Sequence, residues 1–169
     1  NMYIDLEKVT KMEEYIELLA YSVVKSFYPT ALIKYVDGLT LNEAVNFLKE
    51  YVEKGKLSSV VEVKCNEEFN QCFRNIVIVK NLEDAQSMHL HCDICGKEVI
   101  ATDDNTFFKY GFVEKYEELM REKFKKKEEY RTDKRKFKKD VQNAVRVAQT
   151  AQPINITGCN ITVANSDQG

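Results

Sequence analysis

The fold is decided between VKCNEEFNQC (residues 63–72) and HLHCDICGKEV (residues 89–99), which carry four of the five cysteines in two pairs. In the second pair, Cys92 and Cys95 are separated by two residues and followed by Gly96, as in a zinc knuckle. In a knuckle both thiolates bind one tetrahedral ion, and the glycine allows a tight backbone turn. Cys65 and Cys72 have six residues between them, and nineteen residues separate the pairs, as in ribbon-type four-thiolate sites. We therefore predict a zinc ion bound by these four cysteines.

The predicted metal site is structural. Four thiolates close the coordination shell, whereas a catalytic zinc needs an open position and a nearby general base. His89 or His91 in place of Cys65 or Cys72 is the alternative ligand set. In either case the ion contributes directly to the folding of the hairpin around it. The fifth cysteine, Cys159, lies in a polar turn with no base near it in sequence, and we predict an ordinary free thiol.

Length and composition indicate one compact domain with an appendage, or two small domains. The chain is 44% hydrophobic and 31% charged, which favours a helix-rich protein with a real core. No apolar run is long enough to cross a bilayer, and no secretory leader is recognisable. We therefore expect a cytoplasmic protein with reduced cysteines. No nucleotide-binding loop, catalytic triad or paired-carboxylate signature is present, so the sequence does not predict an enzyme.

The residues before the first cysteine have the pattern of three helices and a strand. A helix is predicted at 8–27, with a buried stripe of Met12, Tyr15, Ile16, Leu19, Val23 and Phe27. A short helix or turn follows at 30–37. Thr40 and Glu43 form a capping box that opens the clearest helix, and Gly55 lies where its C-terminal cap is expected. Strands are predicted at 57–63 and 76–79. This order is that of a winged-helix domain whose wing is enlarged by, or replaced with, a metal-bound hairpin.

The third part of the chain is basic. Residues 106–149 combine good helix formers with an apolar first third, and we predict one long helix ended by Pro153. Between Arg121 and Lys139 there are 11 basic and 4 acidic residues, an excess of positive charge that suits nucleic-acid phosphates. The candidate contacts are Arg121, Lys123, Lys125, Lys126, Lys127, Arg131, Lys134, Arg135, Lys136, Lys138 and Lys139. The alternatives are a solvated coiled-coil-like helix, or self-association of this basic arm with the acidic body.

The tail contains INITGCNITV at residues 154–163, in which Ile-Asn-Ile-Thr nearly repeats on each side of Gly158 and Cys159. Alternating β-branched and polar residues around a glycine favour a two-residue hairpin. An isolated two-stranded hairpin is only marginally stable in water. We therefore expect this tail to lie on the body, to pair with another chain, or to remain unfolded.

Two stretches carry a resemblance to known proteins. LTLNEAVNFLKEYVEKGKLSSVVEVKC (residues 39–65), followed by HCDICGKEV (residues 91–99), resembles winged-helix-like modules with a zinc-ribbon or knuckle insert, as found in bacterial proteins. The likeness covers about residues 30–100 and implies site roles for the four cysteines only. The ending PINITGCNITVANSDQG (residues 153–169) is similar to endings of small proteins in bacterial conflict and immunity systems, which accompany effector or signalling partners.

The sequence thus predicts an α+β fold in three parts. Residues 1–104 are expected to form winged-helix-like helices with a zinc-stapled β-hairpin, residues 105–152 a long charged helix, and residues 153–169 a β-hairpin or disordered tail. The expected function is a non-enzymatic, zinc-stabilised interaction or adaptor module that self-associates and binds a protein partner; the tail's resemblance implies a bacterial defence system. The alternative is a winged-helix DNA-binding transcriptional regulator that uses the basic helix. No membrane partner is expected.

Overall fold

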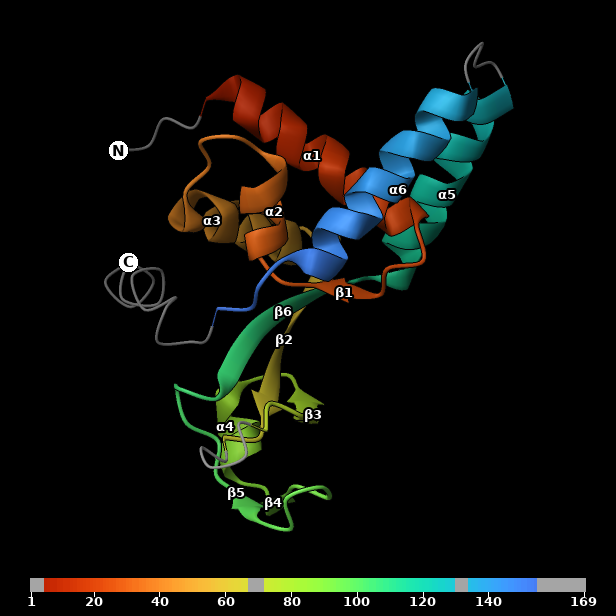
Figure 1. Cartoon of the computed structure of the whole chain (residues 1–169). Coiled ribbons are helices and arrows are strands. Elements are labelled where there is room, and N and C mark those ends of the chain that lie inside the picture. The colour runs from red at the N-terminus through yellow and green to blue at the C-terminus, as the bar shows by residue number, and fades with distance from the viewer. Residues whose placement is uncertain (1–4, 67–71, 130–133, 155–169) are drawn as a thin grey trace. The chain divides into compact units, whose positions relative to one another are not determined.

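The chain divides into two units. The computed structural model describes residues 5–66, 72–129 and 134–154 (Figure 1). Unit 1 comprises residues 1–58 and 110–152, and unit 2 comprises residues 59–109 and 153–169. The combination of helices with small sheets confirms the predicted α+β class. Among the described helices, none is both long and apolar enough to cross a membrane.

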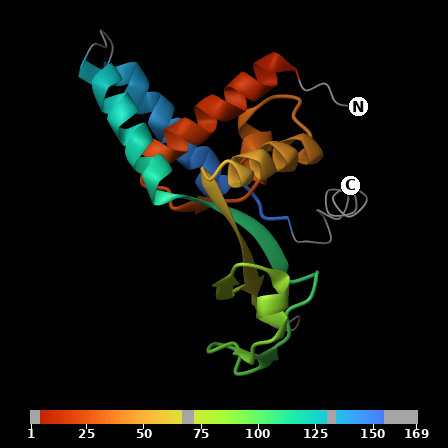
Figure 2. The ribbon, with the colours of Figure 1, turned by 180° about the vertical axis from the view of Figure 1, so that it is seen from behind.

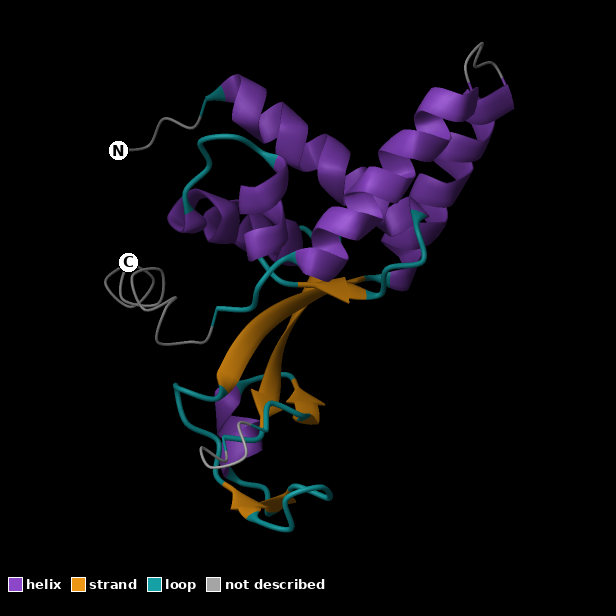
Figure 3. Ribbon diagram, viewed as in Figure 1, coloured by secondary structure: helices purple, strands orange, loops and turns teal. Residues whose placement is uncertain are grey.

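Helices dominate unit 1, and strands dominate unit 2 (Figure 3). Unit 1 contains α1 (Leu6–Tyr21), β1 (Ser26–Phe27), α2 (Thr30–Tyr35), α3 (Leu41–Glu53), α5 (Glu114–Glu129) and α6 (Lys134–Thr150). Unit 2 contains β3 (Asn75–Val79), α4 (Leu82–Gln86), β4 (Leu90–His91) and β5 (Glu98–Val99). The division between units falls within β2 (Leu57–Lys64) and β6 (Thr106–Phe112).

One sheet has the strand order β1-β6-β2-β3, and β4 and β5 form a second, two-stranded sheet. In unit 1, β1 pairs antiparallel with β6, with Ser26 opposite Gly111. In unit 2, β2 pairs antiparallel with β3, with Val61 opposite Val79. The predicted strands at 57–63 and 76–79 are confirmed, and they bring the first cysteine pair to one end of the β2–β3 hairpin.

The first helix ends earlier than predicted. Ser22 caps it, because its backbone N–H donates to the carbonyls of Leu18 and Leu19 and its hydroxyl donates to the Leu19 carbonyl at 2.7 Å. The chain then becomes extended, and Phe27 is buried on β1 instead of on the helix. Val23 leaves the buried stripe and is 81% exposed. The prediction for residues 22–27 is therefore wrong, because a local cap overrides the continued helical period.

The capped third helix is confirmed. Thr40 Oγ1 accepts the Glu43 amide at 3.1 Å, and Glu43 Oε1 accepts the Thr40 amide at 3.0 Å. At the other end Gly55 has φ 75°, and the Lys56 amide donates to the Tyr51 carbonyl at 2.9 Å. This is the left-handed ending that a glycine permits without a steric penalty. The short second helix predicted at 30–37 is present as α2.

The prediction of a single helix from Thr106 to Gln149 is wrong. Residues 106–112 form β6, whose Tyr110 and Phe112 rings pack on Phe27 at centroid distances of 6.0 and 5.5 Å. The helical part is divided into α5 and α6, and both pack against α1 (Figure 2). The apolar residues of TFFKYGF suit a helical period as well as a strand. Pairing with β1 and β2, which are distant in sequence, decides for the strand.

An aromatic cluster joins the three long helices of unit 1. The Tyr21 ring lies 5.5 Å from Phe124 on α5 and 5.4 Å from Phe137 on α6, and these two rings stack at 5.3 Å. The Tyr15 hydroxyl donates to the Ala144 carbonyl at 3.0 Å, deep in the same core. Aromatic pairs at these distances add stabilisation beyond the area they bury. Helices α5 and α6 are thus part of the core of unit 1 and not a free arm.

Unit 1 is expected to unfold at alkaline pH. Burial raises the pKa of Tyr15, Tyr51 and Tyr116 above the usual 10.0. The folded state therefore favours the neutral phenol, and this contribution to stability is complete below pH 10 and is lost as the pH rises through the raised values. We expect loss of helical circular dichroism together with a late rise in tyrosinate absorbance. Ionisation of every tyrosine near pH 10 with the helices intact would contradict this.

Candidate metal centre in unit 2

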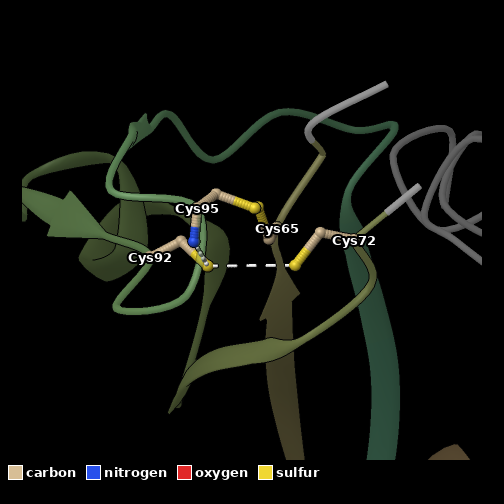
Figure 4. A group of neighbouring side chains, drawn as sticks. All are labelled: Cys65, Cys72, Cys92 and Cys95. Carbon is tan, nitrogen blue, oxygen red and sulfur yellow. Dashed lines mark hydrogen bonds between the residues drawn. The ribbon is translucent and has the colours of Figure 1, made fainter. Parts of the chain in front are cut away.

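Four cysteines come together from three segments of unit 2 (Figure 4). Cys65 directly follows β2, and its amide donates to the carbonyl of Arg74, two residues after Cys72, at 2.8 Å. Cys92 follows β4, and Cys95 lies in the turn before β5. The β2–β3 hairpin therefore supplies one pair and the β4–β5 hairpin supplies the other.

The knuckle turn has the geometry that its sequence predicts. The Gly96 amide donates to the Cys92 carbonyl at 2.8 Å, and the Cys92 amide donates to the Lys97 carbonyl at 2.9 Å. Gly96 has φ 71°, a conformation that other residues adopt only with strain. The Cys95 amide points at Cys92 Sγ, 3.5 Å away. These bonds turn both thiols of the pair to the same side.

The four sulfur atoms have the spacing of a metal tetrahedron. All lie within 4.8 Å of one another. Cys65 Sγ is 3.9 Å from Cys95 Sγ, and Cys72 Sγ is 3.9 Å from Cys92 Sγ. A tetrahedral ion with metal–sulfur bonds of about 2.3 Å requires sulfur–sulfur distances of about 3.8 Å. All four are free thiols without disulfides. The cluster could therefore hold one metal ion with little rearrangement.

The cysteines also form part of the core of unit 2. Cys65 and Cys92 are buried, and Cys72 and Cys95 are half-buried. The other buried members of this core are Val63, Ala85, Leu90, Val99 and Ala101. Several are small, and half-buried apolar residues such as Ile76, Val77 and Leu82 pack against them. A bound metal would add to the stability that so small a core provides.

The thiols of the cluster affect one another's ionisation. The hydrogen bond from the Cys95 amide lowers the pKa of Cys92 to about 7. The side-chain hydrogen bond with Cys72, followed by burial, raises the pKa of Cys95 to about 12. One sulfur is thus easily ionised while a neighbour keeps its proton, because an amide donates to the first and the second shares its thiol proton with the neighbouring sulfurs. A cation at the centre removes this conflict.

Neither histidine belongs to the cluster. The His89 side chain is fully exposed, with Nδ1 3.8 Å from Glu98 Oε1. His91 is also exposed, with Nδ1 3.8 Å from Asp93 Oδ1. Among the described residues, the group that could hold a metal contains cysteines only. The fifth cysteine, Cys159, and the predicted hairpin around it lie outside the described residues.

The basic residues of α5 and α6 differ in their surroundings. Lys123 Nζ forms an ion pair with Glu17 Oε1 at 2.8 Å, which ties α5 to α1. Arg121 lies 3.6 Å from Glu117 one turn earlier on α5. The exposed members are Arg121, Lys125, Lys126, Lys134, Arg135, Lys136, Lys138 and Lys139. Lys127 lies on α5, and Arg131 is outside the described residues.

A buried ion cluster in unit 2 was missed from the sequence. The side chain of Glu62 is completely buried, with Lys64 Nζ at 3.3 Å and Lys109 Nζ at 3.4 Å. The signal available was a carboxylate within a β-branched strand, between Val61 and Val63. The partner Lys109 lies on β6, within the segment predicted to be helical. The cluster has no part in the metal centre.

Comparison of the chain with protein-family models, with curated proteins and with solved structures finds no match.

Proposed function

We propose that this chain is a non-enzymatic, zinc-stabilised protein-interaction module that self-associates. The observation that carries the proposal is the cluster of Cys65, Cys72, Cys92 and Cys95, whose sulfurs lie within 4.8 Å of one another. A tetrahedral set of four thiolates selects zinc or iron among the metals common in proteins. Zinc has no redox chemistry and suits a purely structural role.

The donor set argues against catalysis at the metal. Four thiolates leave no position for water or substrate, and two of them, Cys65 and Cys92, are buried. Within the described part of the chain, neither a histidine nor a carboxylate belongs to the cluster. Phe73 and Ile94, each next to a cysteine in sequence, are exposed, and large apolar side chains on a metal-stabilised surface suit a protein partner.

Elemental analysis of the purified protein tests the metal. We expect one zinc per chain and a colourless protein. If the analysis finds one iron per chain, with visible thiolate-to-iron absorption, then iron and not zinc is the bound metal, and the proposed structural role stays the same. A protein that folds without any metal would overturn the proposal.

Light scattering at high micromolar protein concentration tests self-association. A protein that is strictly monomeric at that concentration would contradict it.

The second candidate function is DNA binding by a winged-helix-like regulator. The element order α1–β1–α2–α3–β2 followed by β6, with strand order β1-β6-β2, supports it, as do the exposed lysines and arginines of α5 and α6. The exposed Glu50 and Glu53 on α3 oppose it, because carboxylates on a recognition helix repel phosphates. Fluorescence anisotropy of labelled duplex DNA, titrated with the protein at low and moderate salt, tests this second function. Tight, salt-sensitive binding favours the regulator, and absence of binding at low salt excludes it.

A further inference from the structure

Two large apolar side chains at opposite ends of α1 stand out from the surface of unit 1. Val23, just beyond the C-terminal end, is 81% exposed, and Leu6, the first residue of the helix, is 78% exposed. They are the most exposed large apolar residues in the described part of the chain. A helix of this length separates its ends by about 24 Å. The two side chains therefore belong to two distinct surfaces.

Val23 lies in a basic groove. The groove has a volume of about 740 Å³ and is formed by the end of α1 together with α5 and α6. Val23, Val141 and Val145 make it apolar, and Lys125 and Arg146 make it positive, together with Arg121, which also pairs with Glu117 on α5. None of the described residues that line it carries a carboxylate. We call it the α1–α5–α6 groove.

Leu6 lies between two acidic residues. We call Asp5, Leu6 and Glu7 the Leu6 knob; all three are exposed. Asp5 Oδ1 accepts the Glu7 amide at 2.9 Å and so caps α1. Glu7 forms an ion pair with Lys11 at 3.4 Å, but exposed pairs of this kind contribute little and exchange easily. The knob is thus an apolar side chain with negative charge on both sides.

Two described lysines follow the knob on α1. Lys8 has partners outside the knob: its Nζ donates to the Gly38 carbonyl at 2.9 Å and lies 3.5 Å from Glu43 Oε1. Lys11 forms the exposed, easily exchanged pair with Glu7 and so offsets part of the knob's negative charge. The knob and the groove therefore match in both respects that guide docking: one is a negative apolar projection and the other a positive apolar recess.

We infer that the Leu6 knob of one copy of the chain docks into the α1–α5–α6 groove of a second copy. This inference rests on the self-association in the proposed function and names the surfaces that carry it. Because knob and groove are different surfaces, the contact is heterologous, and each added copy leaves a free knob and a free groove. Assembly then continues into open chains, or closes only if the rotation between copies permits a ring.

A second copy fits the groove better than a small molecule or a nucleic acid does. The high exposure of Val23 shows a surface open to solvent, whereas sites for small molecules bury most of their ligand. A phosphate backbone would pair with Arg121, Lys125 and Arg146, but it would leave the three valines in water. A leucine flanked by carboxylates satisfies both the apolar and the charged parts of the groove.

Two single variants and their mixture test the inference by sedimentation velocity over a range of protein concentrations. Leu6→Asp destroys the knob and keeps the groove, and Val23→Asp does the reverse. Both side chains are exposed, so neither change disturbs the core. We expect the wild type to form species larger than a dimer as concentration rises. Each variant alone should associate at least about tenfold more weakly. An equimolar mixture should form a one-to-one dimer and nothing larger.

Leu119→Asp is the matched control, because Leu119 is 52% exposed on α5 and lies outside both the knob and the lining of the groove. It should associate as the wild type does. If the wild type associates and neither substitution weakens that association, the docking inference is wrong while self-association stands. The same holds if the mixture of the two variants stays monomeric. A wild type that is monomeric throughout overturns both. If the wild type forms only a closed dimer, and mixing the two variants does not restore a dimer, the inference is also wrong. Such a result would indicate an isologous contact, in which both copies use the same surface.

Discussion

The Cys92→Ser variant is expected to purify without zinc and to lose the folded structure of unit 2, while the helices of unit 1 remain. Cys92 is buried in the cluster, and its sulfur accepts the Cys95 amide and lies 3.9 Å from Cys72 Sγ. A serine hydroxyl is a poor ligand for zinc and shortens the reach of the side chain. With three thiolates the tetrahedron is incomplete, and the metal is lost readily to a chelator.

The expected effect is large because metal binding contributes stability that a larger hydrophobic core would otherwise provide. Structural zinc sites bind with apparent free energies of about 10–16 kcal/mol at neutral pH, which is comparable to the whole stability of a typical domain. Among the described residues of unit 2, the buried cluster at the metal centre has seven members, two of them the candidate ligands Cys65 and Cys92. Helices α1, α5 and α6 have their apolar contacts within unit 1 and are expected to persist.

Elemental analysis and amide nuclear magnetic resonance spectra provide the measurement. The wild type treated with a strong chelator should give the same collapse of unit 2 signals as Cys92→Ser, and zinc should restore them only in the wild type. His91→Ala is the matched control, since His91 is the residue before Cys92 and its side chain lies outside the cluster. It should keep one zinc per chain. Dispersed unit 2 signals and equimolar zinc in Cys92→Ser would contradict the four-thiolate site.

The second large effect is expected from removal of the cations around Glu62. In the double variant Lys64→Met, Lys109→Met, the fully buried carboxylate loses both ammonium groups, which lie at 3.3 and 3.4 Å. Removing the opposite charge beside a buried carboxylate costs about 3–5 kcal/mol, because less of its desolvation is then offset. We expect a loss of this size in the free energy of unfolding of unit 2, measured by urea denaturation of the zinc-loaded protein at constant slope.

A rescue variant separates the charge effect from lost packing. Lys64 also donates to Asn75 Oδ1 at 2.8 Å and lies over the Phe107 ring, so part of the loss comes from these contacts. Adding Glu62→Leu removes the stranded carboxylate and is expected to restore most of the stability, as apolar replacement of buried ion pairs often does. If the free energy of unfolding of the double variant is less than about 1 kcal/mol below that of the wild type, the prediction is wrong.

The parts of the fold that depend on short-range chemistry could be predicted from the sequence. The Thr40–Glu43 capping box, the Gly55 ending and the Cys92–Cys95 knuckle are each complete within a few residues, and all three are present. The strands at 57–63 and 76–79 follow from their β-branched residues. All four cysteines predicted as ligands lie in one cluster, although the metal itself remains a proposal.

Only the tertiary structure decided the rest, because the contacts involved join residues far apart in the chain. Whether TFFKYGF is a strand depends on β1 and β2, which supply its hydrogen-bonding partners. The burial of Glu62 depends on Lys109, which is 47 residues away in sequence. The groove at Val23 exists because α5 and α6 fold back onto α1 next to the residue that the Ser22 cap leaves exposed. The sequence by itself determined the caps, the knuckle and the strand cores, while long-range pairing determined which charged and apolar side chains were buried and which stayed exposed.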